Sequence, residues 1–297
     1  MTWFGGRFQF RGLALICSLV IASADVPLFG QSLQQVSAAG EQQEQALNSQ
    51  QLESLVSPIA LYPDSLLAQI LTASTYPLQL VTAARWVQQN GNLNDKERVA
   101  AAGSQGWDAS IQALVAFPTV LQMMDQSLAW TSALGNVFLA QQSDVMAAVQ
   151  RMRTKAQQSG QLQSNAQQQV ETTTVEGQPA TLIQPADTQV IYVPNYDPTV
   201  VYGDAPENSP YPKMIEPTDA VDAGTVSFSD GVAIGAIFNG GWGWGWGCHW
   251  GAHPSLYVNN DFFAHNGNNF TNRRNWGNAL RWQRQGWMQS QPAVSRP

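Results

Sequence analysis

Residues 63–90 read PDSLLAQILTASTYPLQLVTAARWVQQN, and the spacing of their apolar side chains is that of two amphipathic helices. Pro63 and Pro77 suit the first turn of a helix, where the missing backbone N–H has no partner to lose. Asn90, followed by Gly91, is typical of a helix end. The apolar positions are Leu66, Leu67, Ile70 and Leu71 in the first helix and Leu80, Val81, Ala84 and Val87 in the second.

The helical pattern continues on both sides of this stretch and covers residues 53–165. Asn94, with Glu97 three positions later, matches a capping box. Gly160 is well placed to end the last helix, because glycine adopts the left-handed conformation that often follows one. The sequence therefore predicts a mainly helical domain over this range.

The period changes to that of β-structure in residues 166–205. VETTTV at 170–175 and ATLIQP at 180–185 flank a turn around Gly177, which predicts a hairpin. QVIYVP at 189–194 is expected to add a third strand. We therefore predict an α+β fold, in which this small β segment packs on the helical domain.

The two ends of the chain have other compositions. Residues 25–52 are rich in glutamine and are expected to form a linker. Residues 206–297 are rich in proline, glycine and tryptophan, which predicts a largely flexible tail. Within it, GGWGWGWGCHWG at 240–251 alternates glycine with tryptophan.

The first 24 residues are typical of a cleavable signal peptide. Arg7 and Arg11 precede a short apolar run at 13–21, and the small-x-small triplet at 22–24 follows it. A membrane-spanning helix needs about 20 apolar residues, so this run is too short to act as an anchor. We expect an exported protein that is periplasmic, at the cell surface or secreted, with no transmembrane span in the mature chain.

Composition limits the function classes. Removing residues 1–24 takes Arg7 and Arg11 from the 14 basic residues, which leaves 12 against 21 acidic residues and a net charge of −9. Nucleic-acid binding needs a broad basic surface, so it is not expected. The same cleavage removes Cys17 and leaves Cys248 alone, so the mature chain can form no intramolecular disulfide.

Three long motifs resemble the uncharacterised bacterial family called domain of unknown function 3300. They are LVSPIALYPDSLLAQILTASTYPLQLVTAARWV at 55–87, WDASIQALVAFPTVLQMM at 107–124 and ADTQVIYVPNYDPTVVYG at 186–203. The resemblance covers residues 52–203 and continues more loosely to about residue 270. It implies an exported, envelope-associated protein, and it implies no catalytic residue.

Candidate chemical groups are few, and no catalytic residue is predicted. The acids of the helical domain could serve a hydrolase of envelope polymers, but most of them lie where acids cap helices. Zinc or copper could use the histidine and cysteine side chains near the Trp-Gly run, although their spacing matches no known metal motif. No phosphate-binding or dinucleotide-binding loop is present, so no cofactor is expected. The acids are Asp64, Asp108, Asp125 and Asp144, and the weak metal candidates are Cys248, His249, His253 and His265.

Aromatic and arginine side chains indicate binding instead. Exposed indoles stack on sugars or settle at membrane interfaces, and arginine pairs with phosphate or carboxylate. The leading hypothesis is a non-enzymatic envelope protein that binds an anionic lipid, a glycan or an envelope protein; the alternatives are the hydrolase and the metal-binding protein. The rings could equally cover the core. The candidate surface comprises Tyr192, Tyr196, Tyr202, Trp242, Trp244, Trp246, Trp250, Arg273 and Arg274.

Overall fold

The computed structural model describes residues 46–214, 226–229, 231–237 and 245–258. The predicted signal peptide and most of the predicted linker lie outside these residues. So do several candidate site residues, namely Trp242, Trp244, His265, Arg273 and Arg274. In the described part of the chain no helix is long and apolar enough to cross a membrane.

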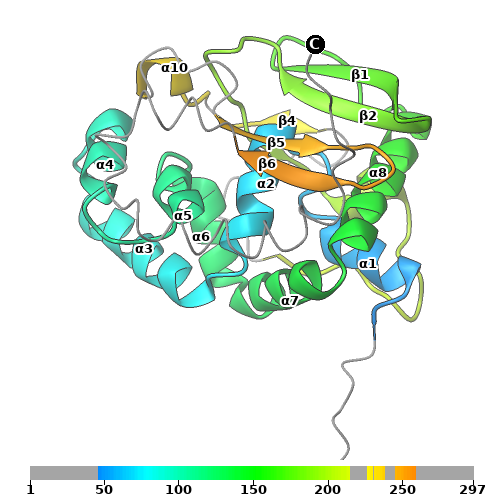
Figure 1. The fold of residues 1–297 in the computed structure, drawn as a ribbon, viewed down its shortest axis with the longest axis horizontal. Helices are drawn as coiled ribbons and strands as arrows, with labels where there is room; N and C mark the ends of the chain where they lie inside the picture. The colour runs from blue at the N-terminus through cyan, green and yellow to red at the C-terminus, as the bar shows by residue number, and fades with distance from the viewer. Residues whose placement is uncertain (1–45, 215–225, 230, 238–244, 259–297) are drawn as a thin grey trace, which may run out of the picture. The chain divides into compact units, whose positions relative to one another are not determined.

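Eight helices follow one another between residues 49 and 158, as the helical pattern predicts (Figure 1). They are α1 (Ser49–Val56), α2 (Asp64–Ala73), α3 (Pro77–Gln89), α4 (Asp95–Ala102), α5 (Ala109–Leu114), α6 (Pro118–Gln126), α7 (Leu128–Ala140) and α8 (Gln142–Gln158). With the strands that follow, the α+β class is confirmed.

The predicted helix ends are largely confirmed. Asn94 and Glu97 form the capping box of α4, and Pro77 opens α3 as its first residue. Gly160 follows α8 with a φ of +74°. Pro63 differs from the expectation: it is the N-cap residue of α2, with extended ψ of 141°, so the helix begins one residue later at Asp64.

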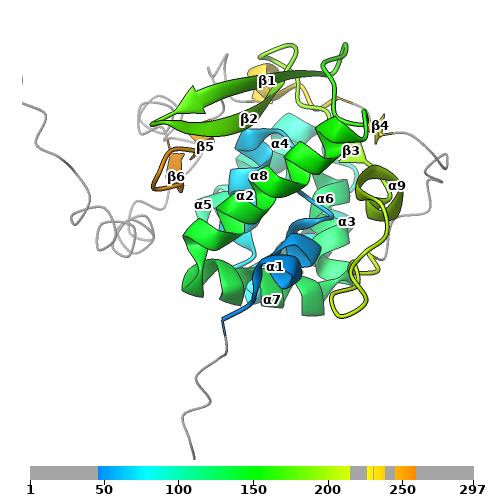
Figure 2. The same ribbon diagram turned by 90° about the vertical axis from the view of Figure 1, so that its right-hand side faces the viewer.

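Helix α2 is the centre of the core. Its residues 66–73 are all buried, and it contacts α5, α7, β2 and β5. Figure 2 shows α1 and α8 together on one side, and α1 packs directly against α8. On the other side α3 packs against α6. A helix that is apolar all round must be enclosed in this way.

The predicted hairpin is confirmed as β1 (Gln168–Val175) paired antiparallel with β2 (Gln178–Pro185). Its two-residue turn has Glu176 at φ +52° and Gly177 at φ +80°. Positive φ at both positions is the type I′ pattern that matches strand twist. Ala180 and Ile183 of β2 are buried, and β2 packs on α2 and α8.

The third predicted strand does not join this hairpin. Ile191 instead forms a single bridge with Val232, and β3 (Pro194–Asn195) pairs with β4 (Ser227–Phe228). Proline interrupts β-ladders because it lacks an N–H, and Pro185 and Pro194 bound the segment. The described strands therefore form three separate two-stranded ladders rather than one sheet. The short helix α9 (Pro198–Tyr202) follows β3.

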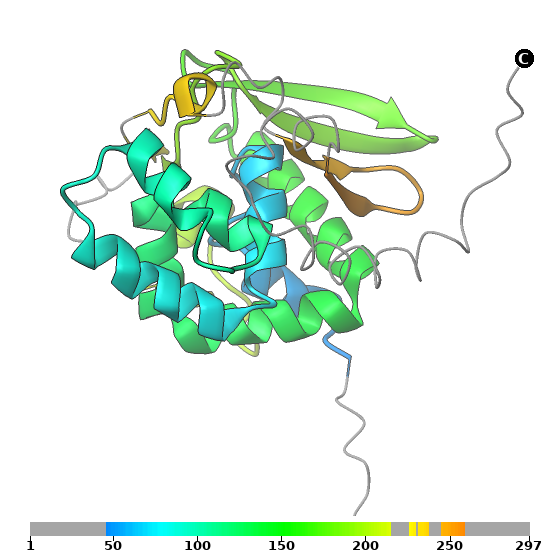
Figure 3. The ribbon, with the colours of Figure 1, turned by 60° about the vertical axis from the view of Figure 1, so that its left-hand side comes forward.

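Two parts of the segment expected to be flexible pack on the helical unit. Helix α10 (Ile234–Ile237) contacts α4. Strands β5 (Trp246–His249) and β6 (Ser255–Val258) form a hairpin, and β5 lies against α2 (Figure 3). In a strand, alternate residues face opposite sides. Trp246 and Cys248 are buried, while a Cβ at Gly247 would lie 2.4 Å from the Tyr257 ring, so a larger residue there would displace the Tyr257 side chain.

Candidate functional site

A fully buried arginine holds the centre of the structure together. Arg153 of α8 has a side-chain exposure of 0%. Its Nε donates to the carbonyl of Ala60 at 2.9 Å and its Nη2 to that of Tyr62 at 3.0 Å. Its Nη1 donates to the carbonyl of Thr181 at 2.7 Å and to Oδ1 of Asp64 at 2.6 Å. Arg153 thereby joins α8, the start of α2 and β2.

The C-terminal hairpin closes over this ion pair. The indole Nε1 of Trp250 donates to Oδ2 of Asp64 at 2.9 Å. The Arg153 guanidinium carbon lies 4.9 Å from the centre of the Trp250 ring, at cation–π distance. The Cys248 thiol donates to the backbone carbonyl of Asp64 at 3.4 Å. We call Asp64, Arg153, Cys248 and Trp250 the ionic clasp.

Burial raises the pKa of two members of the clasp, Asp64 and Cys248. Burial raises the pKa of Asp64, and the charge of Arg153 and the hydrogen bond from Trp250 oppose that rise. Burial also raises the pKa of the Cys248 thiol well above its usual value, and the nearby Asp64 adds to the rise. A thiol is reactive as the thiolate, so a buried thiol of this kind is chemically inert.

Two of the candidate tyrosines point inward. The Tyr196 hydroxyl donates to the carbonyl of Ser57 at 2.9 Å, and the Tyr202 hydroxyl donates to the same oxygen at 3.2 Å. Their rings meet edge to face at 6.0 Å, and burial raises the pKa of both hydroxyls. Tyr192 is half-buried. Tyr196 and Tyr202 therefore cover the connection between α1 and α2, as the core interpretation of these rings expects.

The candidate metal ligands point in different directions. Cys248 faces Asp64, whereas His249 lies with its Nε2 3.3 Å from Oε1 of Glu176 in the β1–β2 turn. The other oxygen of Glu176 accepts the backbone N–H of Ala252 at 2.9 Å, and His253 is exposed. Among the described residues no group of three or more His, Cys, Asp or Glu side chains could hold a metal ion.

Asp108 caps a helix, as its position predicts. Its Oδ1 accepts the backbone N–H of Ser110 at 2.9 Å and the Ser110 hydroxyl at 2.6 Å. The Tyr76 hydroxyl also hydrogen-bonds to the carboxylate, and burial raises the pKa of Asp108. The four acids named from the sequence thus include two, Asp64 and Asp108, whose carboxylates are engaged in internal contacts.

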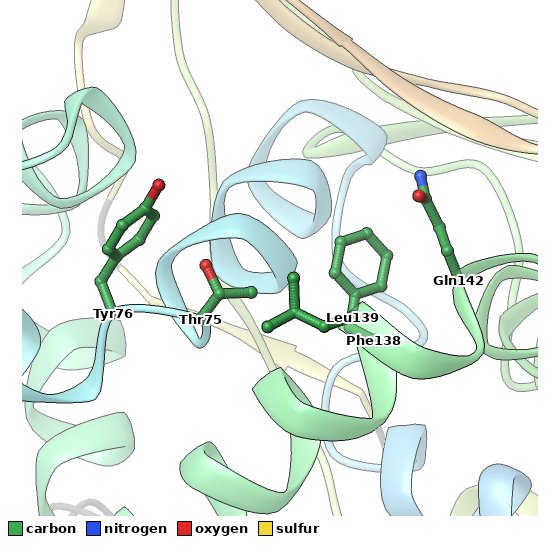
Figure 4. Close-up of a pocket in the computed structure, with 5 residues that line it drawn as sticks. All are labelled: Thr75, Tyr76, Phe138, Leu139 and Gln142. Carbon is green, nitrogen blue, oxygen red and sulfur yellow. The ribbon is translucent and has the colours of Figure 1, made fainter. Parts of the chain in front are cut away.

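The structure contains a hollow of about 480 Å³ between the α2–α3 turn and the α7–α8 junction. In Figure 4 Thr75 and Tyr76 extend from the turn, and Phe138, Leu139 and Gln142 extend from the two helices. This volume is within the range of small-molecule sites. Leu139 is 56% exposed. The apolar side of the hollow is therefore open to solvent.

Next to the hollow, the backbone of α7 lies very close to the backbone of the α2–α3 turn. A Cβ at Gly135 of α7 would lie 2.1 Å from the carbonyl oxygen of Ser74, so only glycine permits the approach of α7 to the α2–α3 turn. No sequence pattern pointed to Thr75, Tyr76, Leu139 or Gln142. Their separate positions in the chain gave no common motif, and only the fold brings the two segments together.

Comparisons with known proteins are consistent with the resemblance seen in the sequence. The model of the family described as "Protein of unknown function (DUF3300)" matches residues 48–284. "Uncharacterized protein YacH" of Escherichia coli (strain K12) is 39% identical over 214 residues, which cover 63% of this chain. The match spans 34% of that relative's own length. No solved structure matches.

Proposed function

Because the chain belongs to this family of uncharacterised proteins, we propose a function from its own residues: an exported envelope protein that acts by binding an anionic surface. The C-terminal segment makes this contact, and the helical unit is its folded base. The export step follows from the signal-peptide pattern at residues 1–24.

The ionic clasp is the observation that carries this proposal. Trp250 and Cys248 lie in the C-terminal third of the chain, yet they are buried against Asp64 and Arg153. A tail that served only solubility would need no such attachment. The clasp fixes the hairpin to the helical unit, and the residues after the hairpin carry five arginines and one acid, Asp261. Arginine side chains bind phosphate and carboxylate groups in fork geometry.

The contacts of two of the four acids, Asp64 and Asp108, argue against a role for these two in the hydrolase alternative. General acid–base catalysis needs carboxyl groups within hydrogen-bonding reach of a substrate. Asp64 is held by Arg153 and Trp250, and Asp108 is held by Ser110 and Tyr76. The contacts of Cys248 and His249 argue against the metal-binding alternative, because these two side chains face different partners.

Export gives the first testable prediction. We expect the mature protein to begin at Asp25 or Gln31, because these positions follow the apolar run and a small residue, Ala24 or Gly30, precedes each of them. N-terminal sequencing of protein purified from the native envelope measures this. Recovery of a chain that retains residues 13–21 in the membrane fraction would contradict it.

Binding gives the second prediction. We expect the mature protein to co-sediment with phosphatidylglycerol vesicles at low salt and much less with phosphatidylcholine vesicles. The binding should weaken as salt rises, because exposed charges are screened over about 8 Å at physiological ionic strength. Replacing four arginines by glutamine should weaken it by about a hundredfold to a thousandfold, since each basic side chain near an anionic surface contributes about 1 kcal/mol and about 1.4 kcal/mol is a factor of ten. The four are Arg273, Arg274, Arg281 and Arg284.

The matched control replaces the same four arginines by lysine, which keeps the charge. This variant should retain most of the binding. If the glutamine variant binds as well as the lysine variant, the arginine-rich segment is not the binding element. If the unaltered protein binds neither vesicle at low salt, the proposal fails.

A further inference from the structure

The hollow at the α7–α8 junction has a distinct hydrogen-bonding character. The Thr75 hydroxyl donates its hydrogen to the carbonyl of Thr72 at 2.7 Å. The Tyr76 hydroxyl gives its hydrogen to the Asp108 carboxylate. A hydroxyl that donates its own hydrogen to a protein acceptor still has lone pairs that can accept a hydrogen bond. Both oxygens are therefore acceptors toward an incoming group.

Gln142 completes the polar side of the hollow. It is the first residue of α8 and is half-buried. Its side-chain amide makes no hydrogen bond with any residue that the structure describes, although the neighbouring Gln141 amide donates to Leu47 at 3.1 Å and to Asp144 at 3.4 Å. A primary amide offers two N–H donors and one acceptor oxygen. Gln142 can therefore act both as a hydrogen-bond donor and as an acceptor toward a ligand.

The remaining lining is apolar and uncharged. Phe138 and Leu139 supply carbon surface on the α7 side of the hollow (Figure 4). Among the residues that the structure describes, no charged side chain lines the hollow. A charged ligand would lose its hydration here and gain no ion pair in return, which is costly. A purely apolar ligand would leave the amide of Gln142 unpaired. The ligand that fits is neutral, rich in hydroxyl or amide donors, and has one face of carbon and hydrogen.

We propose that this hollow binds an uncharged sugar unit of an envelope glycan. Sugar hydroxyl groups donate to Thr75 and Tyr76, and a sugar amide or hydroxyl pairs with Gln142. The C–H face of the ring lies against Phe138 and Leu139, since aromatic and aliphatic carbon packs against such faces. The residues that line this site are not those of the arginine-rich segment, and its ligand is neutral rather than anionic.

The test uses the mature protein with an oligosaccharide of three N-acetylglucosamine units, at high salt so that the arginine-rich segment contributes little. Binding is followed by ligand-observed NMR and isothermal titration calorimetry. Gln142→Ala and Thr75→Val should each weaken binding by about threefold to tenfold, the effect of one hydrogen bond. Leu139→Asp should also weaken it, because a charge replaces apolar wall.

Gln158→Ala is the matched control, because Gln158 is exposed at the other end of α8. It should bind the oligosaccharide as the unaltered protein does. Circular dichroism and thermal unfolding of each variant show whether the fold is kept. Equal binding by Gln142→Ala and Gln158→Ala would overturn the assignment. So would the absence of oligosaccharide binding at millimolar concentration, or preferential binding of a neutral tripeptide amide, which would make the hollow a peptide site. None of these results depends on vesicle binding.

Discussion

Arg153→Met is expected to lower the free energy of unfolding by about 3–5 kcal/mol, the cost of leaving one member of a buried ion pair alone. Methionine fills a similar volume, so the loss comes from charge and hydrogen bonding rather than from a cavity. The Asp64 carboxylate would lose its counter-charge, and the carbonyls of Ala60, Tyr62 and Thr181 would lose their donors. Urea unfolding followed by far-UV circular dichroism measures the change.

Arg151→Met is the matched control, two residues earlier on the same helix. Arg151 is 39% exposed and pairs with Glu53 at 2.5 Å. A solvent-exposed ion pair contributes roughly 0–1 kcal/mol, so this variant should unfold almost as the unaltered protein does. The double variant Asp64→Asn with Arg153→Met should recover part of the loss, because no charge is then left unpaired. If Arg153→Met and Arg151→Met are equally stable, the clasp does not hold the fold.

The helices and the first hairpin could be predicted because their determinants are local. Proline position located the starts of α2 and α3 to within a residue, and Asn90 marked the end of α3. Asn94 and Glu97 marked the start of α4 in the same way. The Glu176–Gly177 turn needs positive φ at both residues, and the sequence around Gly177 carries that information.

The ionic clasp could not be predicted, because its members are far apart in sequence. Asp64 and Trp250 are separated by 186 positions, and Asp64 and Arg153 by 89. One local clue existed. Arg153 follows Val145 and Val149 at helical spacing, so it occupies the buried stripe of α8 rather than its polar face. A charged residue on a core stripe indicates a buried partner without identifying it.

Residues 245–251 are the part of the Trp-Gly run that the structure describes, and their composition predicted a flexible segment. Alternating glycine and tryptophan resembles a flexible repeat, yet in β5 the alternation matches the two faces of a strand. Trp246 turns inward, and Gly247 lets Tyr257 lie against the backbone of the other face. Burial therefore withdraws Trp246 and Trp250 from the surface where we expected them to stack on a ligand.

Gly135→Ala is expected to destabilise the protein by about 1–3 kcal/mol or more, the usual cost of overpacking a tight contact. The added Cβ would lie 2.1 Å from the oxygen and 2.6 Å from the carbon of the Ser74 carbonyl. Both atoms are backbone, so no side-chain rotation relieves the clash. Alanine is favoured over glycine inside a helix by about 1 kcal/mol, and this gain is too small to offset the separation of α7 from the α2–α3 turn.

Gly91→Ala serves as the control, because its Cβ would meet only the carbonyl oxygen of Gln88 at 3.7 Å, an ordinary contact. Its stability should stay within about 0.5 kcal/mol of the unaltered protein, as for most surface substitutions. Thermal and urea unfolding of both variants measures the difference.

The same two variants also bear on the hollow. Because Ser74 precedes Thr75, moving α7 away widens the hollow, so Gly135→Ala should weaken oligosaccharide binding while Gly91→Ala does not. Equal stability of the two variants would show that α7 does not approach the turn as closely as the structure has it.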